Sequence, residues 1–196
     1  TLAKVNYAVS ALPNVANQSP AALSGHIRLA PNVDAIERAF DTAKYGGFSD
    51  EPWIELTIPS VTDPSLAPSG AHVVSAYVQY APYDLRGTTW DDERERLGNV
   101  ATRTIGRYAP GFESTIVARQ VITPFDLERT YGFTGGHIFH GELALDQLFM
   151  GRPVLGWTRY ATPIRNLYLC GAGTHPGLNG GSGVRVAKQI LRNLKS

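Results

Sequence analysis

The chain has one cysteine, Cys170, among its 196 residues, so it cannot form an internal disulfide. Charged residues make up 18% of the sequence, a low share that indicates a well-buried surface or one covered by a partner. The net charge of +1 does not point to nucleic acid or to an anionic membrane. No apolar run approaches the length of about 18 residues that a membrane-spanning helix needs.

An initiator methionine and a signal peptide are also missing. The chain opens at Thr1, and residues 4–9 already alternate between apolar and polar in the manner of a strand. A domain rarely begins inside an element, so we expect an N-terminal part to lie outside this sequence. At 43% hydrophobic residues, the length suffices for one sizeable core or two small ones.

Several motifs of known chemistry are absent. No loop ends in the Gly-Lys-Ser/Thr of a phosphate-binding Walker A motif. The run Gly180-Gly-Ser-Gly183 misses the Gly-x-Ser-x-Gly spacing of a hydrolase nucleophile elbow. His137 and His140 have a His-x-x-His spacing without accompanying carboxylates or thiolates, so we predict no metal site.

Hydrophobic periodicity predicts an α+β fold. Period-two alternation or β-branched runs favour strands, and apolar residues at helical spacing favour helices. Thr89 and Asp92 resemble a capping box at the start of one helix. The order of elements is irregular, which favours a mixed or antiparallel sheet with helices on one side over a doubly wound sheet. The predicted strands cover 4–9, 53–58, 74–80, 115–122 and 167–170, and the predicted helices cover 33–43, 89–108, 124–129 and 184–194.

The strongest chemical feature is the predicted strand, glycine-rich loop and helix over 167–187. Its glycines let the backbone approach a ligand closely, because no Cβ stands in the way. Ser182 is placed to cap the following helix, whose N-terminus suits a phosphate or the electron-rich edge of a flavin. The Gly-x-Gly-x-x-Gly dinucleotide fingerprint is incomplete here, since Gly171-Ala-Gly-Thr-His-Pro lacks the third glycine. From the residues alone, a plain glycine-rich connector is an equal alternative.

The run Leu167-Tyr-Leu-Cys-Gly-Ala-Gly-Thr-His-Pro-Gly177 resembles the C-terminal signature of the phytoene-desaturase-like flavin oxidoreductases. Further blocks, in the same order, are similar to the branch named pyridine nucleotide-disulphide oxidoreductase domain-containing protein two. Among them are Ile54-Glu-Leu-Thr-Ile-Pro-Ser60, Tyr77-Val-Gln-Tyr-Ala-Pro82, Thr123-Pro-Phe-Asp-Leu-Glu-Arg129, Gly135-Gly-His-Ile-Phe-His140 and Arg152-Pro153.

The resemblance implies a substrate-binding portion over residues 1–160 and a C-terminal flavin-cap segment over 161–196. It implies FAD as cofactor, held together with an N-terminal Rossmann portion that this sequence lacks. The implied activity is hydride transfer between flavin and a hydrophobic, isoprenoid- or lipid-like substrate. The implied cofactor-binding residues are Gly171, Ala172, Gly173, His175, Gly180, Gly181, Ser182, Gly183 and Val184.

No catalytic residue follows from the sequence. His140 is a candidate for the substrate cavity, against the alternative of an ordinary packed histidine, and Cys170 is expected to be an inert buried thiol. Further candidates for an apolar cavity are aromatic side chains whose default role is core packing: Trp53, Tyr77, Tyr80, Tyr83, Phe133, Phe139 and Phe149.

Two other functions stay open: a stand-alone lipid-binding or interaction module without redox activity, and an amine-oxidase-like flavoenzyme. We expect a cytoplasmic location and no nucleic-acid partner. Self-association and peripheral membrane contact are further expectations, because an isolated fragment would expose apolar surface around Leu178 and 132–141.

Overall fold

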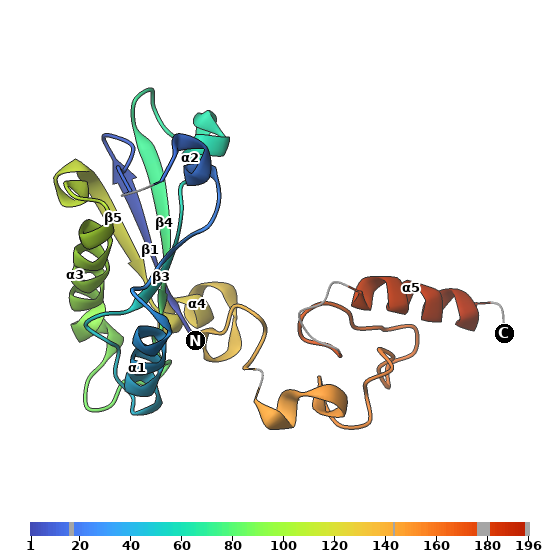
Figure 1. Cartoon of the computed structure of the whole chain (residues 1–196). Coiled ribbons are helices and arrows are strands. Elements are labelled where there is room, and N and C mark those ends of the chain that lie inside the picture. Colours follow the sequence, from blue (N-terminus) through green and yellow to red (C-terminus); the bar gives the residue numbers. More distant parts are fainter. Residues whose placement is uncertain (16–17, 143, 176–180, 195–196) are drawn as a thin grey trace. The chain divides into compact units, whose positions relative to one another are not determined.

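A computed structural model describes residues 1–15, 18–142, 144–175 and 181–194. The chain divides into two compact units, Thr1–Gly136 and His137–Ser196, which we call the sheet unit and the C-terminal unit (Figure 1). The division between a substrate-binding portion and a flavin cap near residue 160 concerns function, and it stays a prediction. Among the described residues, no helix combines the length and the apolar character that crossing a membrane requires.

The sheet unit is built on five antiparallel strands in the order β2-β3-β4-β1-β5. This arrangement confirms the predicted α+β class, in its antiparallel form. The pairing is non-sequential, since β1 lies between β4, the central strand, and β5 at the edge of the sheet (Figure 1). The strands are β1 (Ala3–Val9), β2 (Ile27–Leu29), β3 (Trp53–Thr57), β4 (His72–Gln79) and β5 (Ile116–Ile122).

The apolar and polar residues that alternate in the sequence of β1 alternate between buried and exposed positions in the structure. In β1, Val5, Tyr7 and Val9 are buried, and the residues between them are at least partly exposed. They join one core with the apolar stripe of helix α3, which includes Leu97 and Ile105. One face of the sheet therefore packs against α3, because period-two strands place all their apolar side chains on the same side.

Local capping chemistry sets most helix boundaries. Asn32 caps α1 (Val33–Lys44), and Thr89 caps α3 (Trp90–Tyr108) by accepting the Asp92 N–H, which is one of the two hydrogen bonds of the predicted capping box. Thr123 and Asp126 form a capping box at α4 (Pro124–Tyr131). The remaining α-helices are α2 (Pro59–Thr62) and α5 (Ser182–Asn193), and single 3₁₀ turns cover Pro20–Ser24, Pro64–Leu66, Phe112–Thr115, Thr134–Gly136, Leu145–Gln147 and Phe149–Gly151.

The C-terminal unit has little core of its own. Its only buried large apolar residues among those described are Tyr160 and Val186. The described residues 137–175 contain no strand longer than the isolated bridge between Ala161 and Tyr168. This corrects the prediction of a buried strand at 167–170: the run has no neighbouring strands to cover it, so Cys170 is exposed rather than buried.

Candidate functional site

One side-chain hydrogen bond joins the glycine-rich loop to the start of α5, and a second lies within the loop. The Gly171 N–H donates to Ser182 Oγ at 2.9 Å, and Thr174 Oγ1 donates to the Gly171 carbonyl at 2.9 Å. Both hydroxyl-bearing residues are buried. Gly171 has a φ of +106°, a conformation that favours glycine, so the chain turns here as the sequence suggests.

Ser182 has a different role from the predicted cap. Gly181 is the N-cap of α5, with φ −72°, and no side chain in the part of the chain that the structure describes caps the helix. Ser182 is the first helical residue, and its hydroxyl already accepts the Gly171 N–H. The first N–H groups of any α-helix lack partners within the helix. Ser182 does not cap these groups in α5, and their contact with a ligand stays a prediction.

The predicted site residues on the loop and first turn present backbone with little side-chain cover. A Cβ built on Gly171, Gly181 or Gly183 would meet no atom of the described protein within 4 Å. At Gly173 the nearest atom would be His140 Cβ, at 3.6 Å. Gly180, and Leu178 from the predicted apolar patch, lie outside the described residues.

The two histidines named from the sequence lie in the same unit and meet different groups. His175 Nδ1 donates to the Phe149 carbonyl at 2.7 Å, which anchors the loop to a neighbouring 3₁₀ turn. His140 has an exposed side chain and a φ of +60°, unusual for a residue with a Cβ. The assignment of His140 to a substrate cavity stays a prediction.

Arg152 is the residue that the sequence reasoning missed as a site residue. Only 2% of it is exposed. Its Nε donates to the Ala172 carbonyl at 2.9 Å, and its Nη2 donates to the carbonyls of Phe139 at 2.9 Å and His140 at 3.1 Å. Arg152 therefore joins the 139–140 turn to the glycine-rich loop.

The sequence contains a signal for Arg152 that the overall net charge conceals. All 17 acidic residues lie at or before Asp146, whereas residues 147–196 contain seven lysines and arginines. The C-terminal segment is therefore strongly basic, and no carboxylate within it could neutralise a buried guanidinium.

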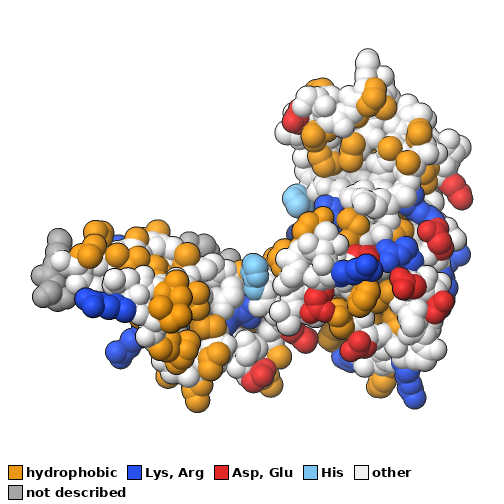
Figure 2. Space-filling model, turned by 180° about the vertical axis from the view of Figure 1, so that it is seen from behind, with side chains coloured by type: hydrophobic (Ala, Val, Ile, Leu, Met, Phe, Trp, Pro, Cys, Tyr) orange, Lys and Arg blue, Asp and Glu red, His pale blue; other side chains and the backbone are white. Residues whose placement is uncertain are grey.

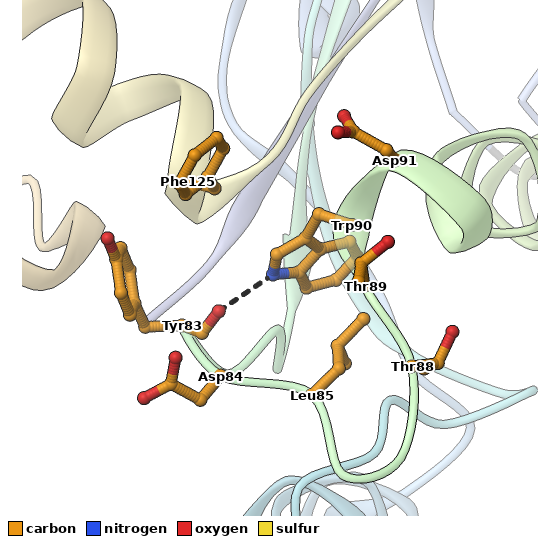
Figure 3. Close-up of a pocket in the computed structure, with 8 residues that line it drawn as sticks. All are labelled: Tyr83, Asp84, Leu85, Thr88, Thr89, Trp90, Asp91 and Phe125. Carbon is orange, nitrogen blue, oxygen red and sulfur yellow. Dashed lines mark hydrogen bonds between the residues drawn. The ribbon is translucent and has the colours of Figure 1, made fainter.

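A separate cavity of about 370 Å³ lies in the sheet unit at the start of α3. Figure 3 shows the rings of Tyr83 and Phe125 on one side and Trp90 with Leu85 on the other. The Trp90 indole donates to the Tyr83 carbonyl at 3.0 Å. The lining also includes Asp84, Asp91, Thr88 and Thr89, so the cavity is of mixed polarity.

The other aromatic candidates occupy different places. Trp53 and Tyr80 lie 6.3 Å apart by ring centroid, on a partly exposed part of the sheet unit. Lys4 lies over the Tyr77 ring at 5.5 Å. Phe139 and Phe149 are exposed in the C-terminal unit. Of the aromatic residues named from the sequence, Tyr83 is the one that lines the cavity at the start of α3.

Comparisons with known proteins first define a class. The chain is 36% identical over 137 residues to phytoene desaturase (lycopene-forming) of Pantoea ananas, covering 68% of this chain and 26% of that protein. It overlaps the crystal structure of an oxidoreductase from Methanosarcina mazei with a TM-score of 0.45 and 16% identity, over 97% of this chain and 34% of that one. No protein-family model matches. The chain is related by sequence to the phytoene-desaturase-like oxidoreductases, as predicted.

A particular branch follows from a further match. The chain is 42% identical over 206 residues to pyridine nucleotide-disulfide oxidoreductase domain-containing protein 2 of Rattus norvegicus, with 98% of this chain covered. The mouse protein of the same name matches at 42% identity over 205 residues. The chain spans about a third of the length of these relatives, since each match covers 35% of the longer protein.

Proposed function

We propose that this chain is the C-terminal part of an FAD-dependent oxidoreductase, and that residues 171–175 and the first turn of α5 contact the flavin. The observation that carries the proposal is the hydrogen bond between the Gly171 N–H and Ser182 Oγ. It joins a glycine loop with exposed backbone to a helix N-terminus that no described side chain caps. Neither feature alone defines a site, whereas together they suit a flat ring with an electron-rich edge.

The residues present fit a flavin on two further observations. The backbone at Gly181 and Gly183 leaves room for close approach of a ligand, because no atom of the described residues lies within 4 Å of a Cβ built there. Arg152 adds a buried positive charge that is hydrogen-bonded to the loop through Ala172. These groups would hold the ring, orient it and favour negative charge on it. The flavin itself would supply hydride-transfer chemistry.

The C-terminal unit supports the proposal by what it leaves exposed. Figure 2 shows apolar side chains gathered on the surface of this unit, at the left of the view. Helix α5 exposes Val184 and Leu191 along one face. The exposed large apolar residues of the unit are Phe139, Leu145, Phe149, Met150, Val154, Leu155, Trp157, Ile164, Leu167, Leu169, Val184, Leu191 and Leu194.

An apolar surface of this extent requires a cover, because soluble proteins rarely leave large contiguous apolar patches in water. The relatives are about three times as long as this chain. We assign the cover to an N-terminal FAD-binding portion of the Rossmann type, which would also grip the pyrophosphate of FAD. Some of this surface would face a hydrophobic, isoprenoid- or lipid-like substrate, in keeping with the name of the desaturase relatives.

The test is the visible absorption spectrum of the intact protein after gel filtration, followed by anaerobic mixing with candidate substrates. We expect stoichiometric flavin, and bleaching of its absorption by an apolar substrate. Bleaching by amines instead would favour an amine-oxidase-like enzyme. A colourless intact protein that takes up no added FAD would refute the proposal and favour a lipid-binding or interaction module.

A further inference from the structure

Arg152 carries a buried charge that its own unit does not neutralise. The side chain is 2% exposed, and no carboxylate lies within ion-pair distance of it among the described residues. Buried charges in proteins are normally paired or bound to an opposite charge. The acidic residues of the C-terminal unit are Glu142 and Asp146, neither forms an ion pair with Arg152, and residues 147–196 contain no acidic residue.

One nitrogen of the Arg152 guanidinium makes no hydrogen bond to a described residue. Arginine has five N–H donors. Three of them serve the carbonyls of Ala172, Phe139 and His140. The third nitrogen, Nη1, is buried and has no hydrogen-bond partner in the described part of the chain. Three carbonyls therefore fix the position of the group, and its charge stays unpaired.

The position of Arg152 connects this charge to the candidate flavin site. Nε bonds directly to Ala172, between the two glycines of the Gly171-Ala-Gly173 turn. Gly171 is in turn bonded to the first residue of α5. The guanidinium and the uncapped helix end thus place two sources of positive potential on the same loop. In a water-excluded site, potential of this kind acts most strongly on a charge that develops during reaction.

We propose that Arg152 is a positioning and electrostatic residue for the bound flavin, and that its charge selectively stabilises the reduced, anionic form. The proposal rests on the proposed function. This role goes beyond the three hydrogen bonds to carbonyls. A residue that only held the loop in place would affect the binding of oxidised and reduced flavin equally. The positive charge of Arg152 would instead favour binding of the reduced flavin, because that form carries the negative charge.

The experiment compares Arg152→Met with Arg152→Lys in the intact protein reconstituted with FAD. Methionine removes the charge and the hydrogen bonds. Lysine keeps the charge but cannot reproduce the planar fork that reaches three carbonyls. The matched control is Arg159→Met, which removes the same charge from an exposed position of the same unit. The measurements are the dissociation constant of oxidised FAD and the midpoint potential of the bound flavin.

We expect Arg152→Met to reduce the preference for reduced over oxidised flavin by about tenfold or more, which lowers a two-electron potential by about 30 mV. Arg152→Lys should keep the potential near the wild-type value while binding FAD more weakly, and Arg159→Met should change neither quantity.

Three results would overturn the assignment, and they are distinguishable. If Arg152→Met binds FAD and the midpoint potential of the flavin is unchanged, Arg152 only holds the loop in place. Should the methionine variant fail to fold, a midpoint potential lowered by about 30 mV or more in Arg152→Lys, which keeps the charge, would exclude the role of charge. If the intact wild-type protein binds no FAD, the proposed function itself falls, and this inference falls with it.

Discussion

Asp126 provides the sharpest test of how the sheet unit is held together. Its carboxylate accepts hydrogen bonds from the Thr123 N–H and hydroxyl, both at 2.8 Å, and it forms a two-pronged ion pair with Arg94, one contact being 3.0 Å. The pair joins α4 to α3. Burial raises the pKa of Asp126, but the hydrogen bonds from Arg94 and Thr123 outweigh burial and lower it to about 2.

The magnitude follows from linkage. A carboxyl whose folded pKa lies below its unfolded value stabilises the fold above the unfolded pKa, and this stability is lost as the pH falls through the folded pKa. The ordinary value is 3.8 and the folded value is about 2, so the window runs from about pH 4 down to about pH 2. At about 1.4 kcal/mol per pKa unit, reduced for partial solvent screening, Asp126 contributes about 1–2 kcal/mol at neutral pH.

The assay is urea unfolding of wild type, Asp126→Asn and Asp91→Asn between pH 7 and pH 2. Asp91 is the matched control, because it faces the same Arg94 at 3.6 Å but is 84% exposed. We expect Asp126→Asn to lower the free energy of unfolding by about 1–2 kcal/mol at pH 7, with the difference from wild type shrinking toward pH 2. Asp91→Asn should cost less than about 0.5 kcal/mol. A difference from wild type that stays constant over this pH range would refute the reasoning.

Three further predictions follow from packing and exposure. Gly98→Ala should destabilise the sheet unit by about 1–2 kcal/mol, because its Cβ would lie 2.8 Å from side chains of β5. Gly106→Ala in the same helix has open space around its Cβ and should stabilise the unit by up to about 1 kcal/mol. Equal effects of the two substitutions in thermal unfolding would contradict this. Residues 1–196 alone should retain little or no FAD after gel filtration, and a yellow fragment with stoichiometric flavin would be the contrary result. The same fragment should self-associate in sedimentation experiments through its apolar surface, less so after Leu191→Glu than after Gln189→Glu, which adds the same charge on another face of α5; a strictly monomeric wild-type fragment would exclude this.

The sheet unit was largely predictable because its signals are local. β1, β3, β4 and β5 agree with the predicted ranges to within about two residues, since each strand alternates or carries a β-branched run. The N-terminus of α3 was predictable from Thr89. β2 was missed because a three-residue strand, Ile27–Leu29, is too short to show a period; its place is set by pairing with β3.

The C-terminal unit was less predictable, because its structure depends on long-range contacts. An apolar run such as 167–170 predicts that another part of the protein covers it, but the run does not identify that part. Ser182 has the residue type of an N-cap, yet the Gly171 N–H occupies its hydroxyl, and no spacing rule shows that bond. Arg152 belonged to one of the blocks that resemble the family, Arg152-Pro153, but that block gave it no role in a site. Only the uneven distribution of charge along the chain, with every acidic residue at or before Asp146, could have marked it in advance.

The most direct test of the central claim is the flavin content of the intact protein carrying Gly181→Val. The backbone at Gly181 has φ −72°, which any residue adopts, and no atom of the described residues lies within 4 Å of a Cβ built there, so we expect the valine variant to fold. Gly106→Val is the matched control at another glycine with open space, and Arg192→Ala tests the far end of α5. We predict that Gly181→Val weakens FAD binding by at least about tenfold, or about 1.4 kcal/mol, while both controls keep wild-type flavin. A folded Gly181→Val protein with full flavin and an unchanged midpoint potential would show that this loop does not contact the ring.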